Sequence, residues 1–207
     1  MAIITEPWIP ESYLKAKALY PARSKYYGIH EYCAPQRWGK NTLLQIDLMD
    51  KLLTDGGFEP DDVHCNFMMF IKGVHCYDTK GLIAAVNDMW ARNVRHIVIV
   101  FDETGQFLIA RQSMNKDQTS FVLKAWQMPK RDWVCLYADN PGNSADCILR
   151  LATQVTLLPR YFHGLTRDED FILYDVIWNH DCMFECANRV DGLAWYQQFY
   201  DTEAAVE

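Results

Sequence analysis

Residues 34–42 carry the residue types that bind phosphate. The segment reads APQRWGKNT, and its Gly39-Lys40 pair lies directly before an expected helix. Backbone N–H groups at a helix N-terminus attract phosphate oxygens, glycine lets the backbone approach them, and lysine binds the β and γ phosphates as a point charge. The segment therefore predicts a nucleotide phosphate site. Its candidate residues are Pro35, Gln36, Arg37, Trp38, Gly39, Lys40, Asn41 and Thr42.

This loop departs from the pattern G-x-x-x-x-G-K-[ST] at two positions. Ala34 replaces the first glycine, and Asn41 replaces the serine or threonine that binds magnesium, with Thr42 one residue late. Taken alone, a Gly-Lys pair after a strand also suits a tight turn with an exposed lysine. We expect the amide oxygen of Asn41 to serve as a magnesium ligand in place of the hydroxyl.

A second pattern follows in residues 97–103, where an unbroken apolar run ends in Asp102 and Glu103. At the end of a buried strand, the first carboxylate can orient magnesium and the second can polarise an attacking water molecule. Strand-end solvation or helix capping is the alternative interpretation. Because both motifs occur in order, with one strand and one helix expected between them, we predict nucleotide hydrolysis with Asp102 at the metal.

The elements that position these residues alternate between strand-like and helix-like segments. Strands are predicted at residues 26–33, 66–71, 95–101, 133–138, 154–158, 171–178 and 183–190. Helices are predicted at residues 41–54, 79–93, 116–128 and 144–153, with a short helix or turn at 193–200. Thr79 and Ser144 are the expected helix caps, and Pro129 the expected end of the third helix.

This alternation predicts an α/β fold with a mostly parallel central sheet flanked by helices, and a C-terminal antiparallel hairpin at one edge. We assign residues 1–25 to an N-terminal extension and residues 26–207 to a single domain.

Residues 34–43 resemble the "PRRxGKTTL"-type phosphate loop of the HerA–FtsK group of P-loop ATPases, which are DNA pumps that include viral genome-packaging ATPases. Three further segments agree with this resemblance. They are Asp102-Glu103 with Phe107 and Arg111 downstream, residues 139–141 with the helix pattern of 146–150, and residues 199–203, which are similar to the terminal "YDTxE". The resemblance covers about residues 26–203.

The resemblance implies a P-loop NTPase fold of the RecA/HerA–FtsK type, with ATP and Mg2+ as cofactors. Lys40 and Glu103 are then catalytic, and Asn140 is favoured over Asp139 as the γ-phosphate sensor, because an amide can donate to phosphate and a carboxylate would repel it. Arg111 or Arg150 would complete a neighbour's site, although a surface salt bridge explains either arginine equally well.

The resemblance also implies partners. The chain would form a homo-oligomeric ring, a hexamer, that moves double-stranded DNA into a preformed capsid, with a capsid or portal-vertex protein as a further partner. A formal net charge of -7 excludes general binding of polyanions, so DNA would contact a basic pore lining or the basic segment 15–40.

Targeting signals and disulfides are not expected. Residues 1–10 do not resemble a signal peptide, and no apolar run approaches the roughly 18 residues of a spanning helix. We therefore expect a cytoplasmic protein, in the host cytoplasm or associated with a virion, with reduced cysteines. The pairs His64-Cys65 and His75-Cys76, and Cys182 with Cys186, have spacings that suit zinc poorly.

Two other functions fit parts of the sequence. A metal-dependent nuclease of the PIN or flap type could use Asp102, Asp139 and Asp146 at strand ends, with Glu31 as the acid of the first strand. That interpretation leaves Gly39-Lys40 without a role. An inactive P-loop subunit with a structural role would explain Ala34 and Asn41.

Overall fold

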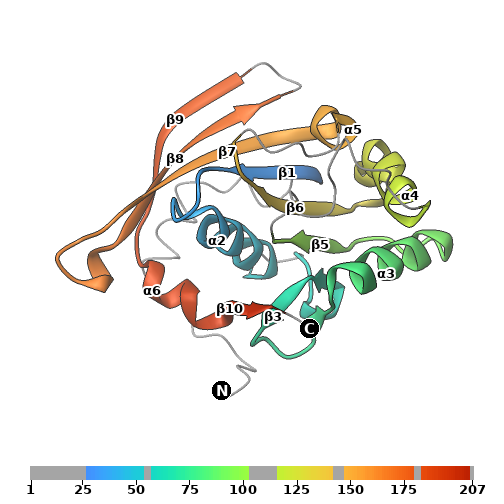
Figure 1. Cartoon of the computed structure of the whole chain (residues 1–207), viewed down its shortest axis with the longest axis horizontal. Helices are drawn as coiled ribbons and strands as arrows, with labels where there is room; N and C mark the ends of the chain where they lie inside the picture. The colour runs from blue at the N-terminus through green and yellow to red at the C-terminus, as the bar shows by residue number, and fades with distance from the viewer. Residues whose placement is uncertain (1–26, 54–56, 103–115, 142–146, 180–182, 206–207) are drawn as a thin grey trace.

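The computed structural model describes residues 27–53, 57–102, 116–141, 147–179 and 183–205 (Figure 1). One eight-stranded sheet forms its centre, in the order β4-β2-β5-β6-β1-β7-β8-β9. The strands are β1 (Gly28–Cys33), β2 (Val63–Cys65), β4 (His75–Cys76), β5 (Val98–Phe101), β6 (Val134–Asp139), β7 (Thr153–Phe162), β8 (Phe171–Trp178) and β9 (Met183–Val190). The α-helices are α2 (Lys40–Leu53), α3 (Thr79–Ala91), α4 (Lys116–Lys124), α5 (Cys147–Ala152) and α6 (Leu193–Tyr196).

Six neighbouring strands of this sheet, from β4 to β7, run parallel to one another. β8 is antiparallel to β7, and β9 is antiparallel to β8. The predicted α/β fold with a C-terminal antiparallel hairpin at one edge is therefore confirmed. β6 lies between β1 and β5, so the strand before the phosphate loop and the strand before Asp102 are not neighbours.

Helices cover both faces of the sheet. α2 and α6 pack on one face, and α3, α4 and α5 lie on the other (Figure 1). The burial of β5 on both faces explains its unbroken apolar sequence. Val98 and Val100 contribute to the core under α2, while Ile99 and Phe101 contribute to the core under α3 and α4. A strand that is buried on both faces needs apolar residues at every position.

A small polar cluster lies inside the core between α2 and β1. Asp47 accepts a hydrogen bond from the Tyr32 hydroxyl and lies 3.3 Å from Nδ1 of His30 and 3.4 Å from Nζ of Lys51. Burial alone would raise the pKa of Asp47, but the Lys51 charge and the bonds from His30 and Tyr32 outweigh it and hold that pKa well below its usual range. Burial lowers the pKa of His30.

Several predicted boundaries are wrong. The sheet strand near residue 66 is β2, and β3 (Phe67–Met69) instead pairs with β10 (Tyr200–Ala205) in a separate two-stranded sheet. α3 is capped by Asp78, whose carboxylate accepts from the N–H of Gly81, rather than by Thr79. β7 continues to Phe162, beyond the predicted end at 158.

The third helix also ends differently. α4 gives way at Lys124 to a 3₁₀ helix over Ala125–Arg131 that contains Pro129. The predicted cap Ser144 and the predicted extension at 1–25 lie outside the described residues. Within the described ranges, no helix has the length and apolar character needed to cross a membrane.

Candidate functional site

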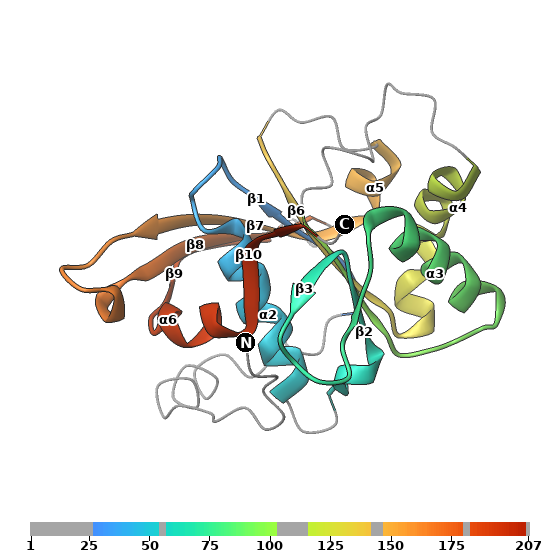
Figure 2. The same cartoon turned by 60° about the horizontal axis from the view of Figure 1, so that its bottom comes forward.

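The candidate site lies where β1, β5 and β6 end. The carboxyl ends of parallel strands meet at one edge of a sheet, which is where α/β proteins bind ligands. β1 leads into the phosphate loop at 34–39 and then into α2, which lies across the sheet in Figure 2. The N–H of Ala34 donates to the Asp139 carbonyl over 3.3 Å, and this bond ties the start of the loop to the end of β6.

The phosphate loop is a tight turn. Arg37 and Gly39 have positive φ angles of 65° and 84°, and the N–H of Leu43 donates to the Gly39 carbonyl over 2.9 Å, which starts the α2 helix. A Cβ atom on Gly39 would lie 2.9 Å from Cδ1 of Ile172 and 3.1 Å from Cδ2 of Tyr161. Gly39 is therefore required both by its backbone angle and by the close approach of the β7–β8 hairpin.

Lys40 is the first residue of α2, and its side chain points toward the end of β6. Its Nζ atom donates to Oδ1 of Asn140 over 2.7 Å, although the two residues lie 100 positions apart. The lysine is only 6% exposed. The structure therefore brings together the predicted phosphate-binding lysine and the predicted sensor amide.

Asn41 and Asp102 are also brought together. Nδ2 of Asn41 donates to Oδ1 of Asp102 over 2.8 Å, while Oδ1 of Asn41 is buried without a hydrogen-bond partner. A buried amide oxygen that accepts no hydrogen bond and lies next to a carboxylate suits Mg2+. This ion takes oxygen ligands and is usually bound by only one or two protein groups, with water as its other ligands. Among the described residues there is no group of three or more His, Cys, Asp or Glu side chains arranged to hold a metal.

Asn66 is a site residue that the sequence interpretation missed. It lies just after β2, where its Oδ1 accepts from the N–H of Asp102 over 2.7 Å and its Nδ2 donates to the Asp102 carbonyl over 3.2 Å. The sequence predicts it to be the first residue of the strand at 66–71. The sequence signal for its role was a polar side chain at the start of the apolar run 67–71.

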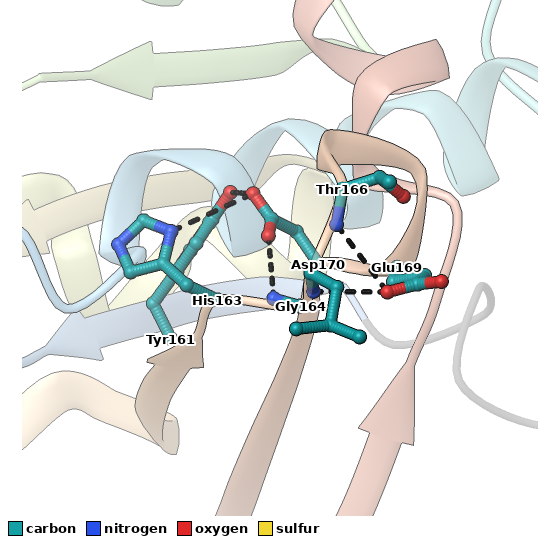
Figure 3. Close-up of polar contacts among 7 residues, drawn as sticks. Tyr161, His163, Gly164, Thr166, Glu169 and Asp170 are labelled. Carbon is teal, nitrogen blue, oxygen red and sulfur yellow. Dashed lines mark hydrogen bonds and ion pairs between the residues drawn. The ribbon is translucent and has the colours of Figure 1, made fainter.

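The tip of the β7–β8 hairpin is braced by hydrogen bonds among its own residues (Figure 3). Asp170 accepts from the Tyr161 hydroxyl over 2.6 Å and from the N–H of Gly164 over 2.9 Å, and these two bonds lower its pKa. The carboxylate of Glu169 accepts from backbone N–H groups of the same tip. The ring of Tyr161 is thereby held against Gly39.

Of the other predicted site residues, some lie outside the described part of the chain and others take no part in these contacts. Glu103 and Arg111 lie outside the described residues. Arg150 is exposed on α5, and its charge partly offsets the rise that burial causes in the pKa of Glu31. Trp38 is 45% exposed in the phosphate loop and is not part of the core.

The acids of the nuclease interpretation do not form a described cluster. Asp139 is buried, and its Oδ1 accepts from the N–H of the following residue. Glu31 accepts from the Thr156 hydroxyl over 3.0 Å. Asp146 lies outside the described residues, and Asp102 accepts a hydrogen bond from Asn41.

The His-Cys pairs form two like pairs across β2 and β4. The rings of His64 and His75 stack with centroids 4.8 Å apart, and the Cys65 thiol donates to Sγ of Cys76 over 3.7 Å. Successive residues of a strand point to opposite faces of the sheet, so the histidines and the cysteines do not converge on one ion.

No protein-family model and no curated protein matches the sequence. Solved structures do match. The genome packaging NTPase B204 from Sulfolobus turreted icosahedral virus 2, in complex with ATP-gammaS, has a TM-score of 0.55 and 7% identity over 82% of this chain and 99% of that chain. The N-terminal domain of zonular occludens toxin from Neisseria meningitidis has a TM-score of 0.50 and 12% identity over 84% and 98%.

A further match is B204, the DNA-packaging ATPase from Sulfolobus Turreted Icosahedral Virus, with a TM-score of 0.50 and 12% identity over 79% and 98%. At these identities the likeness is one of fold. The chain therefore has the fold of P-loop ATPases, viral genome-packaging NTPases among them, as the resemblance implied.

Proposed function

We propose that this P-loop protein is an ATP-hydrolysing DNA translocase that packages viral double-stranded DNA into a capsid. The observation that carries the proposal is the meeting of two contacts at one edge of the sheet, Lys40 with Asn140 and Asn41 with Asp102. They put an ammonium group, two carboxamides and a carboxylate beside the N-terminus of α2. That combination suits a nucleoside triphosphate with its magnesium ion.

Each residue has a distinct role in the proposed reaction. Lys40 binds the β and γ phosphates. Asn140 directs its oxygen at Lys40, which leaves the N–H donors of its amide for the γ-phosphate. Asn41 and Asp102 would hold Mg2+, which neutralises charge on the phosphates when bound. Glu103 acts as the general base on the attacking water.

The proposed assembly is a ring, a hexamer, in which an arginine from one subunit completes the site of the next. Arg111 and Arg150 are the candidates, and Arg150 is exposed on α5, as an arginine that reaches a neighbour must be. Because the net charge is -7, the DNA would contact a locally basic lining of the ring. A capsid or portal-vertex protein is the proposed docking partner, in the host cytoplasm or the virion.

The proposal is tested by ATP hydrolysis with and without double-stranded DNA. Lys40→Ala should abolish turnover and weaken nucleotide binding. Glu103→Gln should still bind ATP while its turnover falls by roughly 100-fold or more, the scale of a general base. Lys72→Ala removes an exposed lysine outside the site and is the matched control, with wild-type activity expected.

Other outcomes would refute the proposal. Mg2+-dependent cleavage of DNA without ATP would support the nuclease, and nucleotide binding without turnover in assembled protein would support an inactive structural subunit. A mixture of Lys40→Ala and Arg150→Ala subunits tests the arginine. If Arg150 acts on the neighbouring site, the mixture regains activity that neither variant has alone.

A further inference from the structure

Asp102 lies just beyond the part of β5 that its neighbouring strands hold. The β2–β5 ladder ends at the pair Cys65 and Val100, and the β5–β6 ladder ends at the pair Phe101 and Tyr137. Regular main-chain pairing therefore stops before Asp102, at the residue whose carboxylate has to be placed accurately.

The side chain of Asn66 takes over where the β2 main chain stops. The N–H of Asn66 still donates to the Val100 carbonyl over 3.3 Å. Its side-chain amide then contacts both backbone groups of Asp102, accepting from the N–H over 2.7 Å and donating to the carbonyl over 3.2 Å. A carboxamide has the same donor and acceptor as a peptide group, so Asn66 continues the ladder by one residue.

A third contact fixes which way the amide faces. Nδ2 of Asn66 also donates to Oγ1 of Thr79, the first residue of α3, over 3.2 Å. Both N–H bonds of Nδ2 are therefore used, and Oδ1 faces the Asp102 N–H. The amide is anchored from β2 and from α3 at once, so it presents a rigid clamp to the end of β5.

We propose that Asn66 is a positioning residue for ATP hydrolysis, which fixes the Asp102 backbone so that the Asp102 carboxylate faces Asn41, the residue with which it would hold magnesium. This inference rests on the proposed function. Asn66 does not itself touch the nucleotide. It acts through Asp102, whose Oδ1 is already 2.8 Å from Nδ2 of Asn41, and through the Asp102 carbonyl, which belongs to the peptide unit leading to Glu103.

The test compares Asn66→Ala with the wild type in ATP hydrolysis at saturating nucleotide. Removing a residue that orients a metal ligand typically lowers metal affinity or activity by about 10- to 100-fold, and we expect kcat to fall within that range. The Mg2+ concentration for half-maximal activity should rise. Nucleotide affinity measured without Mg2+ should not change, because the contacts of Lys40 are untouched.

Two variants separate positioning from folding. Asn179→Ala is the matched control. Nδ2 of Asn179 also donates to a backbone carbonyl, that of Thr153, and to a threonine hydroxyl, that of Thr156, but it does so at the first residues of β7 and not at the strand ends that form the site. This variant should lose stability without a change in kcat or Mg2+ dependence. Asn66→Asp keeps the acceptor for the Asp102 N–H but places an oxygen against the Asp102 carbonyl, so its kcat should also fall.

Hydrogen exchange at the Asp102 amide tests the clamp without any activity. Exchange should be slow in the wild type and faster in Asn66→Ala. Equal exchange in both proteins, or a kcat and Mg2+ dependence of both Asn66 variants equal to the wild type, would overturn the inference. A wild type that neither binds nor hydrolyses ATP would refute the proposed function, and with it the catalytic role of the clamp.

Discussion

Breaking the buried pair of Asp47 and Lys51 should strongly destabilise the packing of α2 on the sheet. The Lys51 side chain is 0% exposed, and its Nζ lies 3.4 Å from Oδ1 of Asp47. At that distance, the Coulomb attraction alone is about 5 kcal/mol with an effective dielectric constant near 20, and the desolvation of both charges opposes it. Asp47→Ala leaves the ammonium group buried without this partner, and we expect a loss of about 3–5 kcal/mol in the free energy of unfolding.

A double-mutant cycle measured by urea denaturation tests this magnitude. Lys51→Met should cost less than Asp47→Ala, because Asp47 keeps its bonds to His30 and Tyr32. The double variant Asp47→Ala/Lys51→Met should be more stable than Asp47→Ala alone, since no charge is then left unpaired in the core. The excess over additivity gives the coupling energy of the pair.

Asp88→Ala is the matched control for this cycle. Asp88 forms an ion pair with Arg92 at the same i,i+4 spacing over 2.8 Å, but the two side chains are 63% and 64% exposed. Exposed helix pairs contribute about 0.3–0.5 kcal/mol, so this variant should change stability little. If Asp47→Ala costs no more than Asp88→Ala, the assignment of a buried charge pair is wrong.

Three further outcomes follow from the structure. The pKa values of His30 and Asp47 are both lowered on folding, so the unfolded state binds more protons. The free energy of unfolding should therefore decrease as the pH is lowered, first below about 6.5 and again below about 4. Denaturation midpoints measured from pH 8 down to pH 3 test this. Gly39→Ala should lose about 1–2 kcal/mol from its positive φ and weaken nucleotide binding, as measured by calorimetry, because β8 must move. A hydrogen bond from its neighbouring thiol lowers the pKa of Cys76 to about 6, whereas burial raises that of Cys33 to about 11, so iodoacetamide should label Cys76 faster at pH 7 by mass spectrometry, although both are half-buried.

Each of these outcomes has a control or a contrary result. Gly192 also has a positive φ, of 73°, at the start of α6, so Gly192→Ala should lose stability and keep nucleotide affinity. Unchanged nucleotide binding by Gly39→Ala would contradict the assignment of the loop. Stability that is flat between pH 7 and 5 would contradict a neutral buried His30, and equal labelling of Cys76 and Cys33 would contradict the thiol pair.

The local parts of the candidate site were predictable from the sequence. The change from strand to loop to helix around Gly39-Lys40 is determined by residues that are neighbours in the sequence. The hairpin strands β8 and β9 have the predicted boundaries. The predicted strand at 154–158 ends just before Pro159, and a proline usually interrupts a strand. The structure continues β7 through Pro159, where its pairing with β1 has ended at Leu157 and its pairing with β8 goes on, with Pro159 opposite Tyr174.

The non-local parts could not be read from the chain. The contact of Lys40 with Asn140 depends on β6 lying between β1 and β5, and the clamp of Asn66 on Asp102 depends on β2 lying beside β5. One local choice could not be read from the sequence either. Asp78 and Thr79 are both good helix caps, and only the hydrogen bond from the Gly81 N–H to Asp78 decides between them.

The bond from Lys40 to Asn140 uses one of the three N–H donors of the ammonium group, so two remain for phosphate oxygens. In the proposed site, the lysine would therefore bind phosphate without giving up Asn140. Its long side chain is already held in one place by this bond, so much of the conformational entropy of fixing it would be lost on folding and not on binding.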